Sequence, residues 1–188
     1  MDIANSVILG AVEGITEFLP ISSTGHLILA SNLLKIPQTE FVKTFEIFIQ
    51  SGAILSVIFL YRRTIIHDFE MIKRVLIAFI PTAIIGFALY KFIKQYLIGN
   101  SEVVLLSLFL GGIVLISIEL LFRSKNHEAR IKGVNGQLSY EKAFVIGLFQ
   151  SVSMIPGVSR AAATIIGGML VGLPRKTAVE FSFLLAVP

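Results

Sequence analysis

Three apolar stretches, each near the length of a bilayer crossing, most constrain how this chain can fold. They cover residues 44–61, 75–90 and 103–122, and a transmembrane helix needs roughly 20 apolar residues. Because lipid offers no hydrogen bonds to the backbone, single segments of this kind cross a membrane as helices. The sequence therefore predicts an all-α polytopic membrane protein.

The composition agrees with this prediction. Of 188 residues, 55% are hydrophobic and 15% are charged, whereas soluble domains carry roughly 25% charged residues. The chain has no cysteine, which excludes thiol nucleophiles and thiolate metal sites. The net charge is +4, but the basic residues gather between apolar stretches. That distribution is typical of cytoplasmic loops, so no nucleic-acid partner is expected.

Polar side chains interrupt the first apolar segment at residues 10–27, GAVEGITEFLPISSTGHL. Glu13 and Glu17 are four positions apart, which places both carboxylates on one face of a helix. Pro20 cannot continue that helix, and three hydroxyl residues follow it at once. The break predicts a re-entrant hairpin over residues 1–34, with its turn at 20–25, since irregular backbone is tolerated at membrane depth where it lines a cavity.

An internal repeat predicts a second hairpin. The offset is the same in four residue pairs: Gly10 and Gly147, Glu13 and Gln150, Ser22 and Ser159, Pro37 and Pro174. An internal repeat constrains the overall architecture, so we consider it before assigning the remaining elements. Because three predicted spans, an odd number, separate the two copies, the second copy must be inverted in the membrane. We therefore predict an inverted-topology repeat, each copy comprising a re-entrant helix hairpin and three transmembrane helices.

The repeat divides the chain into two predicted units. Residues 1–135 form the first repeat, and residues 136–188 begin the second with a hairpin at about 140–173 and a partial span at 174–188. A complete second copy would end at about residue 260 and add roughly seventy residues. The second copy is therefore expected to be truncated in this sequence.

Loop charges predict the orientation. Residues 62–74 hold four basic side chains and residues 123–142 hold five, whereas 35–43 and 91–102 hold two each. Cytoplasmic loops carry the excess of Lys and Arg, so 62–74 and 123–142 are expected in the cytoplasm.

Glu13 and Glu17 are candidates for chemistry, because each intramembrane charge costs roughly 2.5–3.5 kcal/mol on insertion scales. The pair suits a divalent cation, which prefers oxygen ligands, or a general base, since burial and mutual repulsion favour a shared proton. The structural alternative is a pair of acids facing a polar cavity.

A group of hydroxyls and an imidazole follows these acids. Ser22, Ser23 and Thr24 can cap the returning half-helix. His26 comes three and four residues after the serines, which places it on their helix face. A hydroxyl beside a base is the minimal unit of nucleophilic catalysis.

Arg160 is the main candidate in the second copy, where it aligns with Ser23. A guanidinium at membrane depth needs an anionic partner, and its geometry matches phosphate or carboxylate oxygens. The alternative is an ion pair with one of the two glutamates. Ser159 and Thr164 add hydroxyl donors near a half-helix N-terminus that favours anions. Glu46 and Gln50, at the start of the first span, are interpreted mainly as helix-packing or interface residues.

In these motifs the sequence resembles the undecaprenyl-diphosphate phosphatase family, the integral-membrane type described through bacitracin resistance. The matching blocks are EGITEFLPISSTGHL at 13–27, PGVSRAAAT at 156–164 and EFSFLLAVP at 180–188. The resemblance implies hydrolysis of undecaprenyl diphosphate to undecaprenyl phosphate and inorganic phosphate, which recycles the cell-wall lipid carrier. It also implies a divalent cation, Mg²⁺ or Ca²⁺, and a site that opens to the outer face of the bacterial cytoplasmic membrane.

The resemblance also assigns residues to roles. The family's paired acidic residues fall on Glu13 and Glu17, its serine pair and histidine on Ser22, Ser23 and His26, and its phosphate-binding block on Ser159, Arg160 and Thr164. We expect Glu13 and Glu17 also to hold the metal, and Ser22 to help position the phosphate oxygens. Ala161 stands where the family usually has a serine, so no side-chain hydroxyl is available there.

Together these observations predict a phosphatase in which Ser23 attacks the terminal phosphorus and Glu17 or His26 takes its proton. The alternatives that the sequence leaves open are attack by the other serine and direct attack by an activated water. The expected partners are undecaprenyl diphosphate, membrane lipids and a second copy of the chain in a homodimer. The alternative function is an ion-coupled transporter or flippase for a phosphorylated lipid or small anion, because inverted repeats with broken helices are also typical of carriers.

Overall fold

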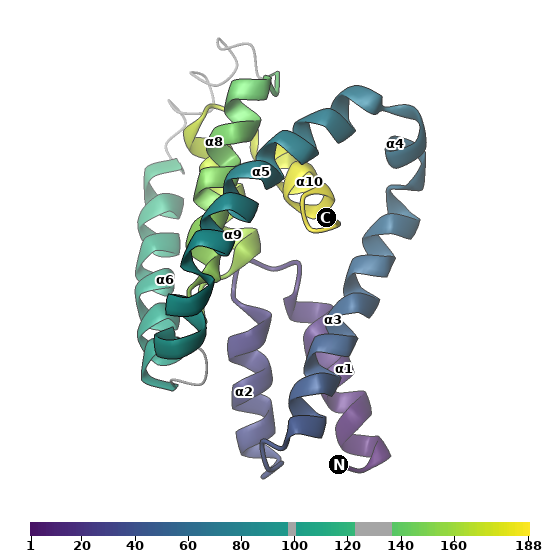
Figure 1. Ribbon diagram of the computed structural model, residues 1–188, viewed down its shortest axis with the longest axis vertical. Helices are drawn as coiled ribbons and strands as arrows, with labels where there is room; N and C mark the ends of the chain where they lie inside the picture. The colour runs from purple at the N-terminus through teal and green to yellow at the C-terminus, as the bar shows by residue number, and fades with distance from the viewer. Residues whose placement is uncertain (98–100, 123–136) are drawn as a thin grey trace.

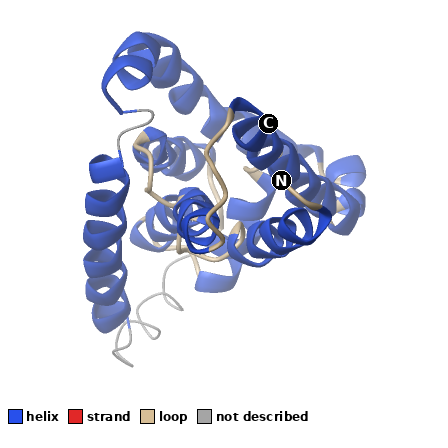
Figure 2. Cartoon of the chain, turned by 90° about the horizontal axis from the view of Figure 1, so that it is seen from below, coloured by secondary structure: helices blue, strands red, loops and turns tan. Residues whose placement is uncertain are grey.

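The computed structural model describes residues 1–97, 101–122 and 137–188, and every regular element in these ranges is helical (Figure 2). The all-α prediction is therefore confirmed for this part of the chain. The elements are α1 (Ile3–Thr16), α2 (Ser23–Leu33), α3 (Glu40–Leu60), α4 (Arg62–His67), α5 (Phe69–Phe92), η1 (Ile93–Leu97), α6 (Ser101–Phe122), α8 (Tyr140–Ser151), η2 (Val152–Met154), α9 (Arg160–Leu170) and α10 (Arg175–Leu184).

In the part of the chain that the structure describes, three helices are long and apolar enough to cross a membrane, as the sequence predicts. They cover Glu40–Leu60, Phe69–Leu97 and Glu102–Phe122. The first two begin earlier than the predicted spans because side chains cap them: Thr39 caps α3 and Asp68 caps α5. In the third, only 6% of the most apolar stretch is buried inside the protein. Its apolar side chains are therefore available to lipid.

Two helix pairs approach each other from opposite ends of the molecule. Figure 1 shows α1 and α2 at one end and α8 and α9 at the other, with their connecting turns meeting in the middle. The first pair packs with α3 around a core that contains Leu9, Leu27 and Val42. The second pair packs with α5 and α10 around a larger core that contains Ile146 and Phe181. The two cores thus hold the two turns against each other.

The turn of the first pair lies earlier than the predicted range 20–25. Helix α1 ends at Thr16, and the physical reason is Pro20, whose ring would collide with the carbonyl of the residue four positions before it. Helix α2 already begins at Ser23. Ser23, Thr24 and Gly25 are therefore helical and do not form the turn.

A close contact between α5 and α8 positions the second pair. The Thr82 hydroxyl donates a hydrogen bond of 3.0 Å to the main-chain oxygen of Gly147. A Cβ atom built on Gly147 would lie 1.9 Å from the Ala78 oxygen and 2.7 Å from Pro81 Cγ. Only glycine allows the two helices to approach this closely.

Candidate active site

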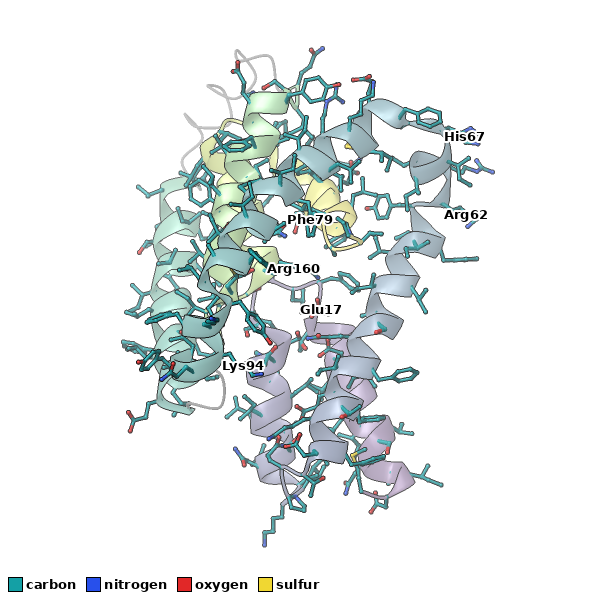
Figure 3. All side chains as sticks on the ribbon, in the orientation of Figure 1. Glu17, Arg62, His67, Phe79, Lys94 and Arg160 are labelled. Atoms are coloured by element: carbon teal, nitrogen blue, oxygen red, sulfur yellow. The ribbon has the colours of Figure 1, made fainter. Side chains whose placement is uncertain are left out.

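Glu17 follows the last turn of α1, and its carboxylate contacts the first residues of α2 and α9. Its Oε1 atom accepts a hydrogen bond of 2.5 Å from Arg160 Nη2, and its Oε2 atom accepts one of 2.5 Å from Ser23 Oγ. Figure 3 shows Glu17 and Arg160 lying close together in the middle of the molecule. The Glu17 side chain is 11% exposed and that of Arg160 is 26% exposed, so the ion pair is largely shielded but can still be reached.

Serine caps place Ser23 and Arg160 at the first positions of their helices. Ser22 Oγ accepts from the Gly25 amide at 3.4 Å, and Ser159 Oγ accepts from the Ala162 amide at 3.1 Å. Ser22 adopts φ +64°, a region that costs energy for a residue other than glycine and is often found at functional sites. Two helix N-termini, with their free amide groups and positive dipole ends, therefore face the same region.

Gly157 fixes the turn that precedes Arg160. Its φ is +94°, and a Cβ atom there would lie 2.7 Å from the main-chain oxygen of Val104 in α6. The positive φ and the close approach both require glycine. The PGVSR segment is thus packed directly against α6, which sets the position of the arginine.

A cavity of about 290 Å³ opens at this junction. It is lined by Glu17, Ser22, Ser23, Thr24, Gln50, Ile54, Ser153, Val158, Ser159 and Arg160. A guanidinium, several hydroxyls and helix N-termini around one space provide the donors that bind a phosphate group. A carboxylate beside a serine hydroxyl also provides the base that nucleophilic catalysis needs.

Five residues of this cavity are not among the sequence-predicted site residues: Thr24, Gln50, Ile54, Ser153 and Val158. Gln50 lies on α3 and Ser153 on η2. The sequence signal for Gln50 was its polar side chain within an apolar span, which often marks function in membranes. The interpretation of Gln50 as a packing residue therefore missed its place in the cavity wall.

Glu13 lies one helical turn before Glu17 and is 1% exposed. Neither of its carboxylate oxygens has a hydrogen-bond partner among the described residues, and its charged neighbours are Glu17 and Glu46. Carboxylate oxygens without a hydrogen-bond partner are the kind of ligand that a hard divalent cation prefers. Within residues 1–97, 101–122 and 137–188, no three His, Cys, Asp or Glu side chains form a metal-ligand group. The protein can thus supply the carboxylates of Glu13 in α1 and Glu17 just after it, and other ligands would come from water or phosphate.

Like Glu13, the predicted site residues His26 and Thr164 do not line the polar cavity. His26 Nδ1 is 2.8 Å from the main-chain oxygen of Ser22, and the Ser23 hydroxyl donates to Glu17. Thr164 is 1% exposed, and its hydroxyl contacts the Arg160 oxygen at 2.9 Å and the Ser182 hydroxyl at 2.6 Å. Thr164 is therefore placed to join α9 to α10, and its predicted contact with phosphate stays a prediction.

A second cavity, of about 620 Å³, adjoins the first and has mainly apolar walls. Ser22, Val158 and Ser159 line both cavities, and His26 lines the apolar one. A polar space and an apolar space therefore share a wall at the caps of α2 and α9.

Comparisons with known proteins identify the family of this chain. A family model described as bacitracin resistance protein BacA matches residues 6–188. The undecaprenyl-diphosphatase of Aquifex aeolicus is 57% identical over 183 residues, covering 97% of this chain and 70% of that protein. The enzymes of the same name from Persephonella marina and Wolinella succinogenes are 56% and 50% identical over 188 residues, covering 100% of this chain and 72% of each relative. With a family match over nearly its whole length and relatives above half identity, this chain belongs to the bacitracin resistance protein BacA family.

Proposed function

We propose that this protein is an undecaprenyl-diphosphatase, a membrane hydrolase that converts undecaprenyl diphosphate to undecaprenyl phosphate and inorganic phosphate. The observation that carries the proposal is Glu17, which binds the Ser23 hydroxyl and the Arg160 guanidinium through its two separate oxygens. The identity of 56–57% to undecaprenyl-diphosphatases supports the same activity. The product is the lipid carrier in the form that cell-wall synthesis reuses.

The mechanism follows from the contacts around Glu17. The terminal phosphate enters the cavity and binds the Arg160 guanidinium in place of the Glu17 carboxylate. Glu17 is then free to accept the proton of the Ser23 hydroxyl. Ser23 Oγ then bonds to the terminal phosphorus as the bond to the bridging oxygen breaks, and undecaprenyl phosphate leaves. Water hydrolyses the phosphoserine, releasing inorganic phosphate and restoring the serine. Arg160 neutralises the charge that develops on the phosphoryl oxygens, while Ser22 and Ser159 orient them.

Phosphate release from undecaprenyl diphosphate by the purified full-length protein tests this function. We expect release by the parent and a loss of at least a hundredfold in Ser23→Ala, because the nucleophile is gone. Ser117→Ala is the matched control and should keep parental activity, since among the described residues the Ser117 hydroxyl bonds only within α6, to the Ile113 oxygen. A parent that moves the lipid across vesicles without releasing phosphate would favour the carrier. Full activity in Ser23→Ala would instead indicate direct attack by water.

A divalent cation, Mg²⁺ or Ca²⁺, fits the acidic pair of α1. Glu13 and Glu17 would hold it, and the unpartnered buried oxygens of Glu13 support this assignment. When bound, the cation would neutralise part of the diphosphate charge.

We expect a chelator to abolish phosphate release and added Mg²⁺ or Ca²⁺ to restore it. Glu13→Gln removes one ligand charge, so the cation concentration that gives half activity should rise about tenfold or more. Parental activity after complete chelation, checked by elemental analysis of the protein, would exclude the requirement.

The orientation of the site is also proposed from the loops and the fold. Helix α4 and the start of α8 lie at the same end of the molecule (Figure 1), and both belong to the basic segments 62–74 and 123–142. We propose that this end faces the cytoplasm, that the two opposed hairpins are the matching parts of an inverted repeat, and that the site opens to the outer face of the bacterial cytoplasmic membrane. The homodimer stays a prediction from sequence.

Cysteine labelling in intact cells tests the orientation, since the chain has no cysteine of its own. We expect an impermeant thiol reagent to label Gln38→Cys, in the connection 35–43, and to leave Asp68→Cys unlabelled until the cells are opened. Labelling of Asp68→Cys from outside would reverse the orientation.

A further inference from the structure

The apolar cavity beside the Glu17 site has one wall formed by α6, and glycines lie in the middle of that wall. Ser107, Gly111, Gly112 and Leu115 line it from α6, and Ile166 lines it from α9. We propose that this wall binds the first isoprenoid units of the substrate, and that Gly111 and Gly112 determine how well a long chain is accepted. This inference rests on the proposed phosphatase function and names residues that select the lipid part of its substrate.

The position of the cavity relative to the phosphate site supports an isoprenoid occupant. A diphosphate bound at Arg160 must direct its hydrocarbon chain out of the polar cavity. Ser22 and Ser159 line both spaces, so the apolar cavity begins where the polar one ends. Its chemistry changes at the same place, from hydroxyls and a guanidinium to aliphatic side chains. A lipid with an anionic head group and an apolar chain fits a polar cavity that adjoins an apolar one.

The length of the cavity matches several isoprenoid units. Its lining runs along α9 from Ser159 to Ile166, roughly 10 Å at the rise of an α-helix. On α6 it runs from Ser107 to Leu115, roughly 12 Å. The volume of about 620 Å³ lies within the usual range of small-molecule pockets. The space therefore holds the start of the chain, and the remainder would extend into lipid.

The glycines explain why this part of the wall is open. A Cβ atom on Gly111 or Gly112 would meet no atom within 4 Å. By contrast, a Cβ atom on Gly25 would lie 2.8 Å from Leu108 Cδ1, where α6 packs directly against α2. Glycine inside a helix destabilises it relative to alanine, and no protein contact within the described residues requires glycine at these two positions. Gly52 is equally open, but Gly111 and Gly112 differ from it in lining the apolar cavity, where a larger side chain would occupy the space of a ligand chain.

Kinetics with two chain lengths tests the proposal. We expect Gly111→Leu, in the purified full-length protein, to lower kcat/KM for undecaprenyl diphosphate about tenfold or more, mainly through KM. For dimethylallyl diphosphate, whose single unit ends near the shared wall, kcat/KM should stay near the parental value. Gly52→Leu is the matched control, because Gly52 on α3 also has no atom within 4 Å of its Cβ position and lines neither cavity. Equal losses for both substrates, or none for either, would overturn the inference.

A binding measurement keeps the test independent of catalysis and of variant folding. An undecaprenyl diphosphate analogue with a photoreactive group on its second or third isoprenoid unit should label residues 101–122 of the parent protein. Label found only on other helices, or fully displaced by ordinary phospholipid, would overturn the assignment of this wall. Label on α6 from a protein that releases no phosphate would keep the chain-binding site and reject the phosphatase function, so the two failures are distinguishable.

Discussion

Replacing Arg160 with alanine is expected to lower phosphate release from undecaprenyl diphosphate by about a thousandfold, within the range found for arginines that stabilise phosphoryl transfer. Arg160 is the guanidinium in the wall of the polar cavity, and its partner Glu17 is only 11% exposed. The variant therefore loses transition-state charge stabilisation and also leaves a shielded carboxylate without its cation. Steady-state rates at saturating substrate, with a folding check by size-exclusion chromatography and thermal unfolding, measure the effect.

Two further variants separate charge from geometry. Arg160→Lys keeps the positive charge but loses the planar, two-donor geometry of the guanidinium, so it should recover only part of the activity. Arg175→Ala breaks the ion pair between Arg175 and Glu119, both more than half exposed, and neither residue lines the polar or the apolar cavity. It should leave phosphate release unchanged, because exposed ion pairs contribute little. If the folded Arg160→Ala protein released phosphate within tenfold of the parental rate, Arg160 would be a structural partner of Glu17 and not a group that stabilises the transition state.

Gly147→Ala is expected to cause the largest loss of stability among these variants, about 3 kcal/mol, because overpacking of a tight contact forces the backbone to move. The added Cβ atom would lie 1.9 Å from the Ala78 oxygen, and this oxygen belongs to the α5 backbone and cannot rotate away. Helices α5 and α8 would have to separate, which weakens the hydrogen bond from Thr82 to Gly147. Since α8 leads into the turn before Arg160, activity should fall with stability.

Thermal unfolding in detergent measures this difference. Gly52→Ala is the control, since its Cβ atom would meet nothing within 4 Å and alanine favours the helix. It should unfold at or slightly above the parental temperature. A Gly147→Ala protein that unfolds with the parent would show that α5 and α8 can move apart at little cost.

The membrane helices and the polar motifs could be predicted from the sequence because both depend on local properties. A stretch of apolar residues reports contact with lipid wherever it lies in the fold. Glu17 and Arg160 also stand out by their charge alone, since intramembrane charges are costly and need partners. The break after α1 was predicted from Pro20, but its position was wrong by several residues because the ring acts on the carbonyl four positions earlier.

Which side chains meet at the polar cavity is determined by the tertiary structure. The sequence left open whether Arg160 would pair with Glu13 or with Glu17, and the packing of the two turns selects Glu17. Glu13 stays buried, with no hydrogen-bond partner among the described residues. The same packing places Gln50 in the cavity wall and directs the Thr164 hydroxyl toward Ser182. Helical periodicity defines the face on which a side chain lies, but not the helix that covers that face. That depends on distances between helices, such as the approach of α8 to α5 at Gly147, which only the packed chain sets.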